Sequence, residues 1–377
     1  MTSLRARRYN ARMMSDWSRF DSILVWLPNH AGDAIMATPA LRALRCAWPG
    51  VRWVAVARPA GADLLAGGPW AENLIVDRSA NRPRLAALAR LRRQIAASGA
   101  RAGILFPNSF RSAALARLGG VKPLAGYRRD GRGWLLSVAL APQRDDRGRR
   151  RPVPTIDYYL ALAEALGAQP RGRQMELPVS EADEAQARQR LSQAGLDDGR
   201  PLVMLNPGAA YGPSKLWPAE RYAAVADELI RRHRAGIVIN AAPNERDIAN
   251  AVEAAMTETP GLNLAAGGNS LGLVKALARR CRLVITNDTG ARHVAAAVGT
   301  AVVTLFGSTD PVWAQIDYPR ERRLRHDVPC GPCQKKQCPL PPGPDHHLCM
   351  KRIAVDEVLE ASEALLTTAA DPQEAGR

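Results

Sequence analysis

The 377-residue chain has no run of ~18 or more apolar residues, the length that a membrane-spanning helix needs. Its residues 1–20 are basic with scattered apolar positions, and they lack the continuous apolar core of a secretory signal peptide. We therefore expect a cytoplasmic protein that touches the inner membrane at most peripherally.

Aromatic residues make up only 5% of the chain, and it carries no helix-turn-helix, zinc-finger or RNP signature. These absences argue against nucleic acid as the partner, although the formal net charge of +16 indicates some anionic partner. Only six of the 52 basic residues are lysine, so part of the excess reflects the codon habit of a GC-rich genome. A phosphorylated lipid acceptor at an anionic membrane surface explains the sign of the charge equally well.

Strand-like apolar runs alternate with helical stretches along the chain, a pattern typical of α/β proteins with parallel sheets. The length allows two such domains, each with a full core. A basic stretch at 144–154 and a polar run at 197–200 bracket the expected interdomain region, so we place the boundary near 175–200. The predicted strands are 21–28, 51–56, 73–77, 102–106, 202–206, 236–240, 282–286 and 301–306.

Residues 202–218 (LVMLNPGAAYGPSKLWP) are the most informative segment, because a buried-type strand leads through a glycine-rich loop into a helix. Gly208 and Gly212 can adopt positive φ and turn backbone N–H groups toward a ligand, and Lys215 adds a mobile positive charge. Pro218 fits the first turn of the helix. The loop matches neither GxxxxGK[ST] nor GxGxxG. It predicts a phosphate cradle; the alternative is an ordinary loop with a solvated lysine.

Residues 282–306 predict a strand, a tight turn, a helix that opens at Asp288, Thr289 and Gly290, and a further strand. Unbonded N–H groups and the helix dipole favour an anionic or hydroxyl-rich group at such a turn. His293 lies four residues after Thr289 and therefore on the same helix face. The simpler alternative is an N-cap beside a packed histidine. However, ligands of open α/β sheets bind at the carboxyl ends of the strands, where both turns would lie.

A third strand-to-helix turn follows the first predicted strand and contains Asp33. The helix dipole would hold the Asp33 carboxylate ionised, so this side chain is a candidate general base; the alternative is a helix cap. The apolar positions of the helix that share a broad face are Ile35, Met36, Leu41 and Leu44.

Four of the six cysteines lie within one proline-rich segment with the spacing C-x2-C-x4-C-x10-C. In a cytosolic protein such a cluster indicates metal binding or redox chemistry rather than disulfides. Four thiolates would suit tetrahedral zinc or iron and would pin a loop with little core of its own. The alternative is free thiols in a substrate-side loop. The cluster comprises Cys330, Cys333, Cys338 and Cys349, with His346 and His347 in the last gap.

Six segments together resemble one enzyme family over nearly the whole chain. They are GDAIMATPALRALR at 32–45, LFPNSFRSA at 105–113, GYRRDGRGWLL at 126–136, YYLALAEALG at 158–167, NPGAAYGPSKLWP at 206–218 and TNDTGARHVAAA at 286–297. With them the chain resembles glycosyltransferase family 9, the ADP-heptose:lipopolysaccharide heptosyltransferases, and most closely the heptosyltransferase II branch. The resemblance implies an α/β GT-B architecture, in which two Rossmann-like domains face each other across a cleft. It also implies an inverting, metal-independent transfer.

The domain plan follows from the same resemblance. By analogy, the last helix, at about 355–367, would cross back onto the N-terminal domain. The expected parts are a basic extension at 1–20, an acceptor-binding domain at 21–180, a nucleotide-sugar-binding domain at 181–350 with a Cys-rich loop at 329–350, and the last helix and tail at 351–377.

The implied chemistry joins the three turns. Asp33 would deprotonate an acceptor hydroxyl, which attacks the anomeric carbon of ADP-heptose from the face opposite the diphosphate. Lys215 and the helix start at Thr289 would stabilise the ADP leaving group without Mg²⁺. Glu245 would bind the adenosine ribose, with Asp247 as the alternative because NAAPNERD departs from the usual acidic pattern.

The resemblance assigns the remaining site residues to two groups. Those on the donor side are Asn206, Gly208, Gly212, Ser214, Asp288, Thr289, Gly290 and His293, of which His293 would contact the diphosphate or the sugar. Those on the acceptor side are Asn108, Ser109, Arg111, Tyr127 and Arg128, for which strand-end capping and surface charge are the alternative.

The implied partners are an ADP-heptose donor, a phosphorylated Kdo-lipid A or heptosylated core acceptor, and an anionic inner-membrane surface. No cofactor is required for the transfer. A Cys-rich C-terminal segment also occurs in the heptosyltransferase II branch, and an iron-binding cysteine motif occurs in the related autotransporter heptosyltransferases, so structural zinc or iron stays open.

Three rival functions remain. An autotransporter-type protein heptosyltransferase or another GT-B transferase would share the donor-side residues, but the NSFRS and GYR segments favour the lipopolysaccharide branch. A nucleotide-sugar-binding protein without chemistry has no need of Asp33 together with Lys215. A basic nucleic-acid-binding protein would show steeply salt-dependent affinity for DNA or RNA.

Overall fold

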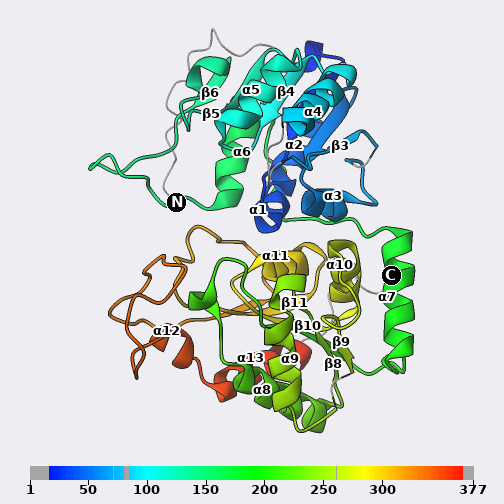
Figure 1. The fold of residues 1–377 in the computed structure, drawn as a ribbon, viewed down its shortest axis with the longest axis vertical. Helices are drawn as coiled ribbons and strands as arrows, with labels where there is room; N and C mark the ends of the chain where they lie inside the picture. The colour runs from blue at the N-terminus through cyan, green and yellow to red at the C-terminus, as the bar shows by residue number, and fades with distance from the viewer. Residues whose placement is uncertain (1–16, 71, 80–84, 260, 368–377) are drawn as a thin grey trace. The chain divides into compact units, whose positions relative to one another are not determined.

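The computed structural model describes residues 17–70, 72–79, 85–259 and 261–367, which form two α/β units (Figure 1). The N-terminal unit comprises residues 1–175 and 312–317, and the C-terminal unit comprises 176–311 and 318–377. Residues 1–16 of the expected N-terminal extension and residues 368–377 of the expected tail lie outside the described residues. None of the helices in the described part of the chain has both the length and the hydrophobicity that crossing a membrane requires.

The N-terminal unit is built on a parallel sheet with the strand order β3-β2-β1-β4-β5-β6. All five residues of β1 are buried, as expected for a strand covered on both faces. The strands are β1 (Ser22–Trp26), β2 (Arg52–Ala57), β3 (Leu74–Val76), β4 (Ala102–Leu105), β5 (Leu124–Tyr127) and β6 (Val138–Leu140).

Helices cover the first sheet in two groups. α4 and α5 share an apolar cluster with β1, β2, β4 and β5. In a second group, α2 packs against α6, and α1 packs against α3 and α6. The helices are α1 (Ala31–Met36), α2 (Thr38–Ala47), α3 (Pro59–Leu65), α4 (Leu85–Ala97), α5 (Phe110–Leu118) and α6 (Thr155–Ala165), with short 3₁₀ turns η2 (Trp17–Arg19) and η3 (Gly133–Leu135).

The C-terminal unit repeats the same plan, because its parallel strands take the order β9-β8-β7-β10-β11-β12. Counted from β7, this is the order 3-2-1-4-5-6 of the first sheet, which is the doubly wound Rossmann order. The strands are β7 (Leu202–Asn206), β8 (Gly236–Ile239), β9 (Leu262–Asn263), β10 (Leu283–Asn287), β11 (Ala301–Leu305) and β12 (Glu321–Leu324).

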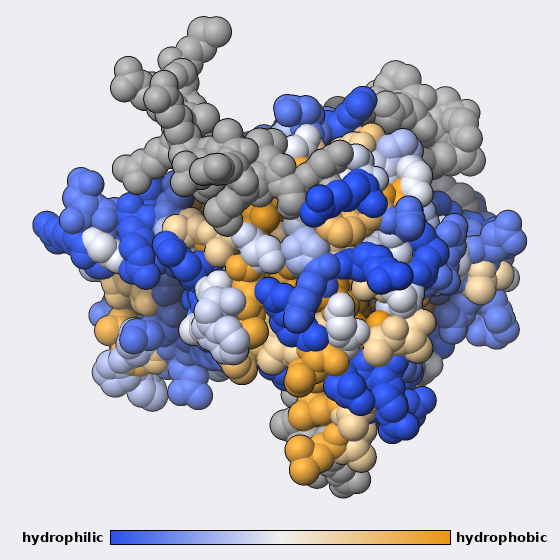
Figure 2. Space-filling view, turned by 90° about the horizontal axis from the view of Figure 1, so that it is seen from above, coloured by the Kyte–Doolittle hydropathy of each residue, from blue (hydrophilic) through white to orange (hydrophobic). Residues whose placement is uncertain are grey.

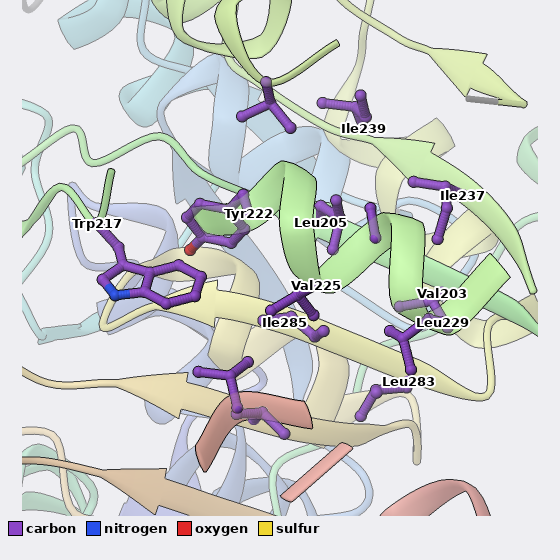
Figure 3. Close-up of a cluster of buried hydrophobic side chains, with 14 of the residues drawn as sticks. Val203, Leu205, Trp217, Tyr222, Val225, Leu229, Ile237, Ile239, Leu283 and Ile285 are labelled. Carbon is purple, nitrogen blue, oxygen red and sulfur yellow. The ribbon is translucent and has the colours of Figure 1, made fainter. Parts of the chain in front are cut away.

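The helices of the C-terminal unit lie on both sides of its sheet, with α8, α9 and α13 on one side and α10 and α11 on the other (Figure 1). They are α7 (Glu181–Gln193), α8 (Ala219–His233), α9 (Arg246–Ala255), α10 (Leu271–Arg280), α11 (Gly290–Ala297), α12 (Leu348–Lys351) and α13 (Val355–Thr367), with 3₁₀ turns η4 (Pro213–Lys215) and η5 (Pro243–Glu245). Figure 3 shows the centre of this core, where Tyr222, Val225 and Leu229 of α8 lie against Val203, Leu205, Ile237, Ile239, Leu283 and Ile285 of the strands.

The structure corrects the expected position of the last helix. α13 has the predicted bounds, but it packs on α8, β10, β11 and β12 of the C-terminal unit instead of crossing to the N-terminal domain. Buried Val358, Leu359 and Leu365 join the apolar cluster of that unit. An amphipathic pattern predicts that a helix has a buried face, but it does not identify the surface that covers it.

The predicted strands are confirmed, whereas β5, β6, β9 and β12 were missed. The missed strands are short, and three of them contain residues that are not fully buried, so their apolar signal is weak. The single helix expected after Asp33 is divided at Ala37 into α1 and α2.

The strand order determines where a ligand can bind. Neighbouring strands whose connections run in opposite directions open a crevice at their carboxyl ends. In the two sheets these pairs are β1 with β4 and β7 with β10. Each of the three turns singled out in the sequence follows one of these strands. Figure 2 shows one face of the molecule, on which hydrophilic side chains surround smaller hydrophobic areas.

Candidate active site

A buried ion pair joins the turns that follow β7 and β10. The Nζ atom of Lys215 donates to Oδ2 of Asp288 at 2.7 Å and to the Asp288 carbonyl at 2.6 Å. Both side chains are less than a tenth exposed, so the Lys215 ammonium is fixed rather than mobile, contrary to the sequence-based expectation. It also lies 5.0 Å from the centre of the Tyr211 ring. The pair places a lysine charge beside the N-terminus of α11.

Besides Lys215, the Asp288 carboxylate has two neighbours that hold its charge. Burial raises its pKa, but Lys215, Arg292 and a hydrogen bond from Thr309 outweigh this and lower the pKa below the ordinary value. The Thr309 hydroxyl donates to Oδ2 at 2.7 Å. Arg292 is itself held by Glu321, with contacts of 2.6 and 3.0 Å. Asp288 is therefore ionised at neutral pH.

No described side chain caps the N-terminus of α11. Thr289 is the N-cap residue, yet its side chain makes no capping hydrogen bond to the helix that the structure describes. Its hydroxyl instead accepts from Nδ2 of Asn206 at 3.4 Å and lies 3.2 Å from the Thr286 hydroxyl. Thr289 therefore leaves the first backbone N–H groups of α11 uncapped, and an uncapped helix N-terminus favours an anion.

His293 lies one turn into α11 and is buried, with 4% of its surface exposed. Burial, together with the charge of Arg292, lowers the pKa of His293 to about 3, so the imidazole is neutral at physiological pH. Its Nδ1 atom has no hydrogen-bond partner among the residues that the structure describes. A buried nitrogen without a partner is costly, and a ligand at this turn would satisfy it.

Two asparagines that the sequence analysis missed extend the polar edge of the second sheet. Asn240 donates to Oδ1 of Asn206 at 2.6 Å, and Asn269 donates to Oδ1 of Asn240 at 2.6 Å. The amides therefore form a chain from Asn269 to Thr289 along the carboxyl ends of the strands. The sequence did contain one indication of Asn240: it is the last residue of the predicted strand 236–240, and the ends of such strands carry binding residues.

The two loop glycines are required for different reasons. Gly212 has φ 151°, and a Cβ atom there would meet the Lys336 carbonyl. Gly208 is not among the positive-φ glycines, contrary to expectation, but a Cβ atom there would collide with the Glu245 carboxylate. Glu245 thus lies beside the β7–α8 loop (residues 207–218), where its Oε2 accepts from the Ala242 N–H at 3.3 Å. The alternative residue, Asp247, is exposed and lines a pocket with Leu216, Trp217 and Pro218 at the end of the same loop.

In the N-terminal unit, Asp33 lines a polar cavity of about 260 Å³. Burial raises the pKa of Asp33, and the opposing charges of His30 and Arg150 offset this only in part. Asn108, which follows β4, lines the same cavity and accepts from the Tyr158 hydroxyl at 3.0 Å. The full lining is Asp33, Asn108, Arg129, Arg150, Val153, Thr155, Tyr158, Tyr159 and Trp313.

The other residues expected on the acceptor side do not line the Asp33 cavity. Ser109 caps α5, with its Oγ accepting from the Ser112 N–H at 3.3 Å. Arg111 pairs with buried Asp77 at 2.9 and 3.1 Å. Tyr127 is buried and stacks on Tyr158, with ring centres 3.6 Å apart. Capping and structural pairing therefore account for Ser109 and Arg111.

Arg128 lines a second, arginine-lined pocket of about 560 Å³. Arg129 and Arg150 line both this pocket and the Asp33 cavity. These two arginines were missed, because a basic stretch in a chain rich in arginine gives no specific signal. The pocket also contains Asp130, Gly131, Gly133, Trp134, Pro142 and Arg144.

The Cys-rich loop (residues 329–350) brings part of the predicted metal cluster together. Cys338, His346 and His347 each offer a ligand atom, and these atoms lie within 4.8 Å of one another. Cys330, Cys333 and Cys349 belong to the same segment but not to this group of three. Burial raises the pKa of the Cys349 thiol, and the neighbouring thiols Cys330, Cys333 and Cys338 add to this. The predicted four-cysteine set is thus replaced by a mixed sulfur and nitrogen group.

The chain is similar to known proteins over nearly its whole length. The model of glycosyltransferase family 9 (heptosyltransferase) matches residues 88–343. Lipooligosaccharide heptosyltransferase 2 of Campylobacter jejuni is 24% identical, covering 92% of this chain and 99% of that protein. Lipopolysaccharide heptosyltransferase 2 of Escherichia coli K12 is 30% identical, but the match covers 55% of this chain and 60% of that protein.

Two solved structures share the fold. ADP-heptose LPS heptosyltransferase II of E. coli has a TM-score of 0.74 and 26% identity, covering 92% of this chain and 98% of that one. A glycosyl transferase family 9 protein of Veillonella parvula has a TM-score of 0.78 and 26% identity, covering 93% and 98%. The predicted α/β GT-B fold class is thus confirmed.

The Lys215–Asp288 pair makes a prediction about stability. Lys215→Met leaves a buried carboxylate without its ammonium partner, which typically costs about 3–5 kcal/mol of unfolding free energy. Adding Asp288→Asn removes the unpaired charge, so the double variant should recover part of the loss. Urea unfolding of the wild type and the three variants measures this coupling. Additive losses in the double variant would show that the two charges do not stabilise each other.

Proposed function

The chain belongs to glycosyltransferase family 9 (heptosyltransferase) and is a glycosyltransferase, and on that premise we propose that it moves a heptose from ADP-heptose to a hydroxyl group of the lipopolysaccharide inner core. Proteins similar to it over almost all of its length carry the names lipooligosaccharide heptosyltransferase 2 and ADP-heptose LPS heptosyltransferase II. The proposed reaction inverts the anomeric centre and needs no metal ion.

One observation carries the donor side of the proposal, namely the open turn of α11 between a fixed ammonium and an unpartnered nitrogen. Lys215, the first N–H groups of α11 and Nδ1 of His293 come from one unit and offer a cation and hydrogen-bond donors. A neutral His293 with its proton on Nδ1 would donate to a diphosphate oxygen. This set suits a diphosphate better than a neutral sugar.

The leaving group would be stabilised without Mg²⁺ by the same groups. As the bond to the anomeric carbon breaks, negative charge grows on the diphosphate of ADP, and the Lys215 ammonium and the α11 dipole are already oriented for it. Asp288 would hold the lysine in position rather than touch the substrate. Glu245, beside Gly208, would accept from the adenosine ribose.

Asp33 would act as the general base of the transfer. Its raised pKa makes it a stronger proton acceptor than an ordinary aspartate. It would take the proton of the acceptor hydroxyl, whose oxygen forms the new bond as ADP leaves. The polar lining of its cavity, including Asn108 and Tyr158, suits a sugar.

The arginine-lined pocket would bind the charged groups of the acceptor. Arg128, Arg129, Arg144 and Arg150 line it, and two of them also line the Asp33 cavity. Arginines match phosphate and carboxylate groups by forked hydrogen bonds. This supports a phosphorylated Kdo-lipid A or heptosylated core as acceptor and disfavours a neutral protein side chain.

A nucleotide-release assay tests the proposal. The protein is incubated with ADP-heptose, ADP-glucose, UDP-glucose and GDP-mannose, each with and without a Kdo-containing or heptosylated lipid A acceptor. We expect release of ADP from ADP-heptose that requires the acceptor and is unchanged by added Mg²⁺ or Mn²⁺. Release from UDP-glucose alone, or an absolute requirement for a divalent ion, would reject the proposed reaction.

Asp33→Asn is the matched variant for this assay. We expect turnover to fall by about 10²- to 10⁴-fold, the usual contribution of a general base, while ADP binding is unchanged. Because the folded-state pKa of Asp33 is raised, ionisation of this group destabilises the folded protein as pH rises through and above its ordinary value. The variant should therefore melt no lower than the wild type at pH 7. Turnover within a few-fold of wild type would show that Asp33 is not the general base and has only a structural role at the start of its helix.

We further propose peripheral binding to an anionic membrane through exposed aromatic residues beside the arginine-lined pocket. Trp134 is 75% exposed, lines that pocket and lies 6.3 Å from the ring of Phe110. Exposed aromatic side chains next to arginines suit a lipid headgroup layer with negative charge.

Vesicle sedimentation tests the membrane proposal. We expect binding to vesicles that contain phosphatidylglycerol, weaker binding at high salt, and at least a several-fold loss in the double variant Phe110→Ser, Trp134→Ser. Leu85→Ser is the control, because Leu85 is also exposed but does not line the pocket. Equal losses in both variants, or equal binding to phosphatidylcholine vesicles, would contradict the proposal.

A further inference from the structure

Residues 334–336 of the Cys-rich loop pack against the β7–α8 loop, and we call them the wall. The Tyr211 hydroxyl donates to the Gln334 carbonyl at 2.8 Å, and the Ser214 N–H donates to the Lys336 carbonyl at 3.1 Å. The Ser214 hydroxyl donates to the Lys335 carbonyl at 2.5 Å. Three successive carbonyls, Gln334 to Lys336, therefore hold the turn that carries Lys215.

Further contacts tie the same wall to the loop that follows β11. The Gln334 N–H donates to the Ser308 carbonyl at 2.9 Å, and the Ser308 and Ser214 hydroxyls lie 2.9 Å apart. Gly212 leaves no space for a side chain against the Lys336 carbonyl. The position of residues 334–336 thus determines the position of η4, and Lys215 is the last residue of η4.

The wall itself has little regular structure to hold it. Between β12 and α12, residues 325–347 contain no helix or strand, and most of them are at least partly exposed. Loops longer than about 12–15 residues without secondary structure are uncommon in compact domains. Without a strong internal constraint, such a loop would be a poor support for a catalytic lysine.

Cys338, His346 and His347 supply the chemistry of such a constraint. Their ligand atoms lie within 4.8 Å of one another, and Cys338 lies two residues beyond the carbonyl of Lys336. A thiolate with two imidazoles is a ligand set that zinc prefers. A fourth thiolate is available from Cys330, Cys333 or Cys349, all on the same segment.

Two hydrogen bonds act on Cys338 and His346 as they would in a metal site. The backbone N–H of His347 donates to Sγ of Cys338 at 3.3 Å, a bond that stabilises a thiolate. Nδ1 of His346 lies 2.8 Å from the Leu340 carbonyl. Because a carbonyl only accepts, Nδ1 carries the proton and Nε2 keeps its lone pair for a metal ion.

We propose that Cys338, His346 and His347, with one further thiolate of the segment, bind a structural zinc ion that fixes residues 334–336 and thereby positions Lys215 for the donor diphosphate. The zinc takes no part in bond making or breaking. The effect on donor binding rests on the proposed function, whereas the zinc site does not. Ser214 is then a positioning residue, since it links the wall to the lysine turn.

Metal analysis of protein purified without a histidine tag tests the zinc site. We expect about one zinc per chain in the wild type and in the control Cys46→Ser, and loss of zinc in Cys338→Ser and His347→Ala. Cys46 is the matched control because it is an exposed cysteine outside the loop. A wild type that retains no zinc after incubation with zinc and gel filtration, or stoichiometric iron instead, would overturn the assignment.

A second measurement on the wild type avoids variants that fail to fold. Removing zinc with dipicolinate should speed amide hydrogen exchange in residues 211–216 and weaken ADP binding by about 5-fold or more, and zinc should restore both. Amide exchange in β1 of the other unit is the internal control. Unchanged exchange and unchanged ADP affinity after complete zinc removal would overturn the positioning role. If the zinc-loaded wild type binds no ADP at all, the proposed function fails while the zinc result stands.

Discussion

The ion pair between Lys215 and Asp288 is the interaction on which the C-terminal site depends. It connects the loop after β7 to the turn after β10, across the two strands where the sheet order reverses. A buried pair of this kind is sensitive to its surroundings, because each charge has been removed from water and depends on its protein partners. Arg292 and Thr309 hold the Asp288 carboxylate in place, and the carbonyls of the Cys-rich loop hold the turn that carries Lys215. Asn287 adds a neutral link, donating to the Pro207 carbonyl at 2.8 Å.

The two units place different chemistry at equivalent positions of the same strand order. In the N-terminal unit, the carboxyl ends of β1 and β4 lead to a cavity with a half-buried aspartate and two arginines. In the C-terminal unit, β7 and β10 lead to a fixed ammonium, a helix N-terminus and a neutral histidine. The proposed transfer assigns the raised-pKa carboxylate of the first unit to the general base and the fixed ammonium of the second to the leaving group.

Much of the fold follows from local pattern. Buried strands such as 202–206 and the helix start at Thr289 have strong signals in a few consecutive residues, and they are where the sequence predicts them. Pairing over long distances has no such signal. Lys215 was expected to be mobile, because nothing in its own segment identifies Asp288, 73 residues later, as its partner. The prediction of which domain α13 packs against was wrong for the same reason, since its partners in β10 and β11 are far away in the sequence.

The residues of the candidate site that lie close to the end of a predicted strand could be predicted from the sequence, and the others could not. Asn108 and Thr289 lie just after strands and Asp33 lies in the helix that follows β1, so the strand pattern locates all three. Arg129 and Arg150 reach the cavity from irregular segments and are hidden among many other arginines. The mixed Cys338, His346 and His347 group depends on the path of a loop without regular structure, which spacing alone does not determine.

Calorimetric titration of ADP and of adenosine into the wild type and Lys215→Ala tests the central claim most directly. If Lys215 holds the donor diphosphate, the variant should bind ADP about 10- to 100-fold more weakly, which corresponds to the loss of one charge-assisted contact. Adenosine, which lacks the diphosphate, should bind both proteins alike. Equal affinity of both proteins for ADP would contradict the account and would leave Lys215 as a structural partner of Asp288.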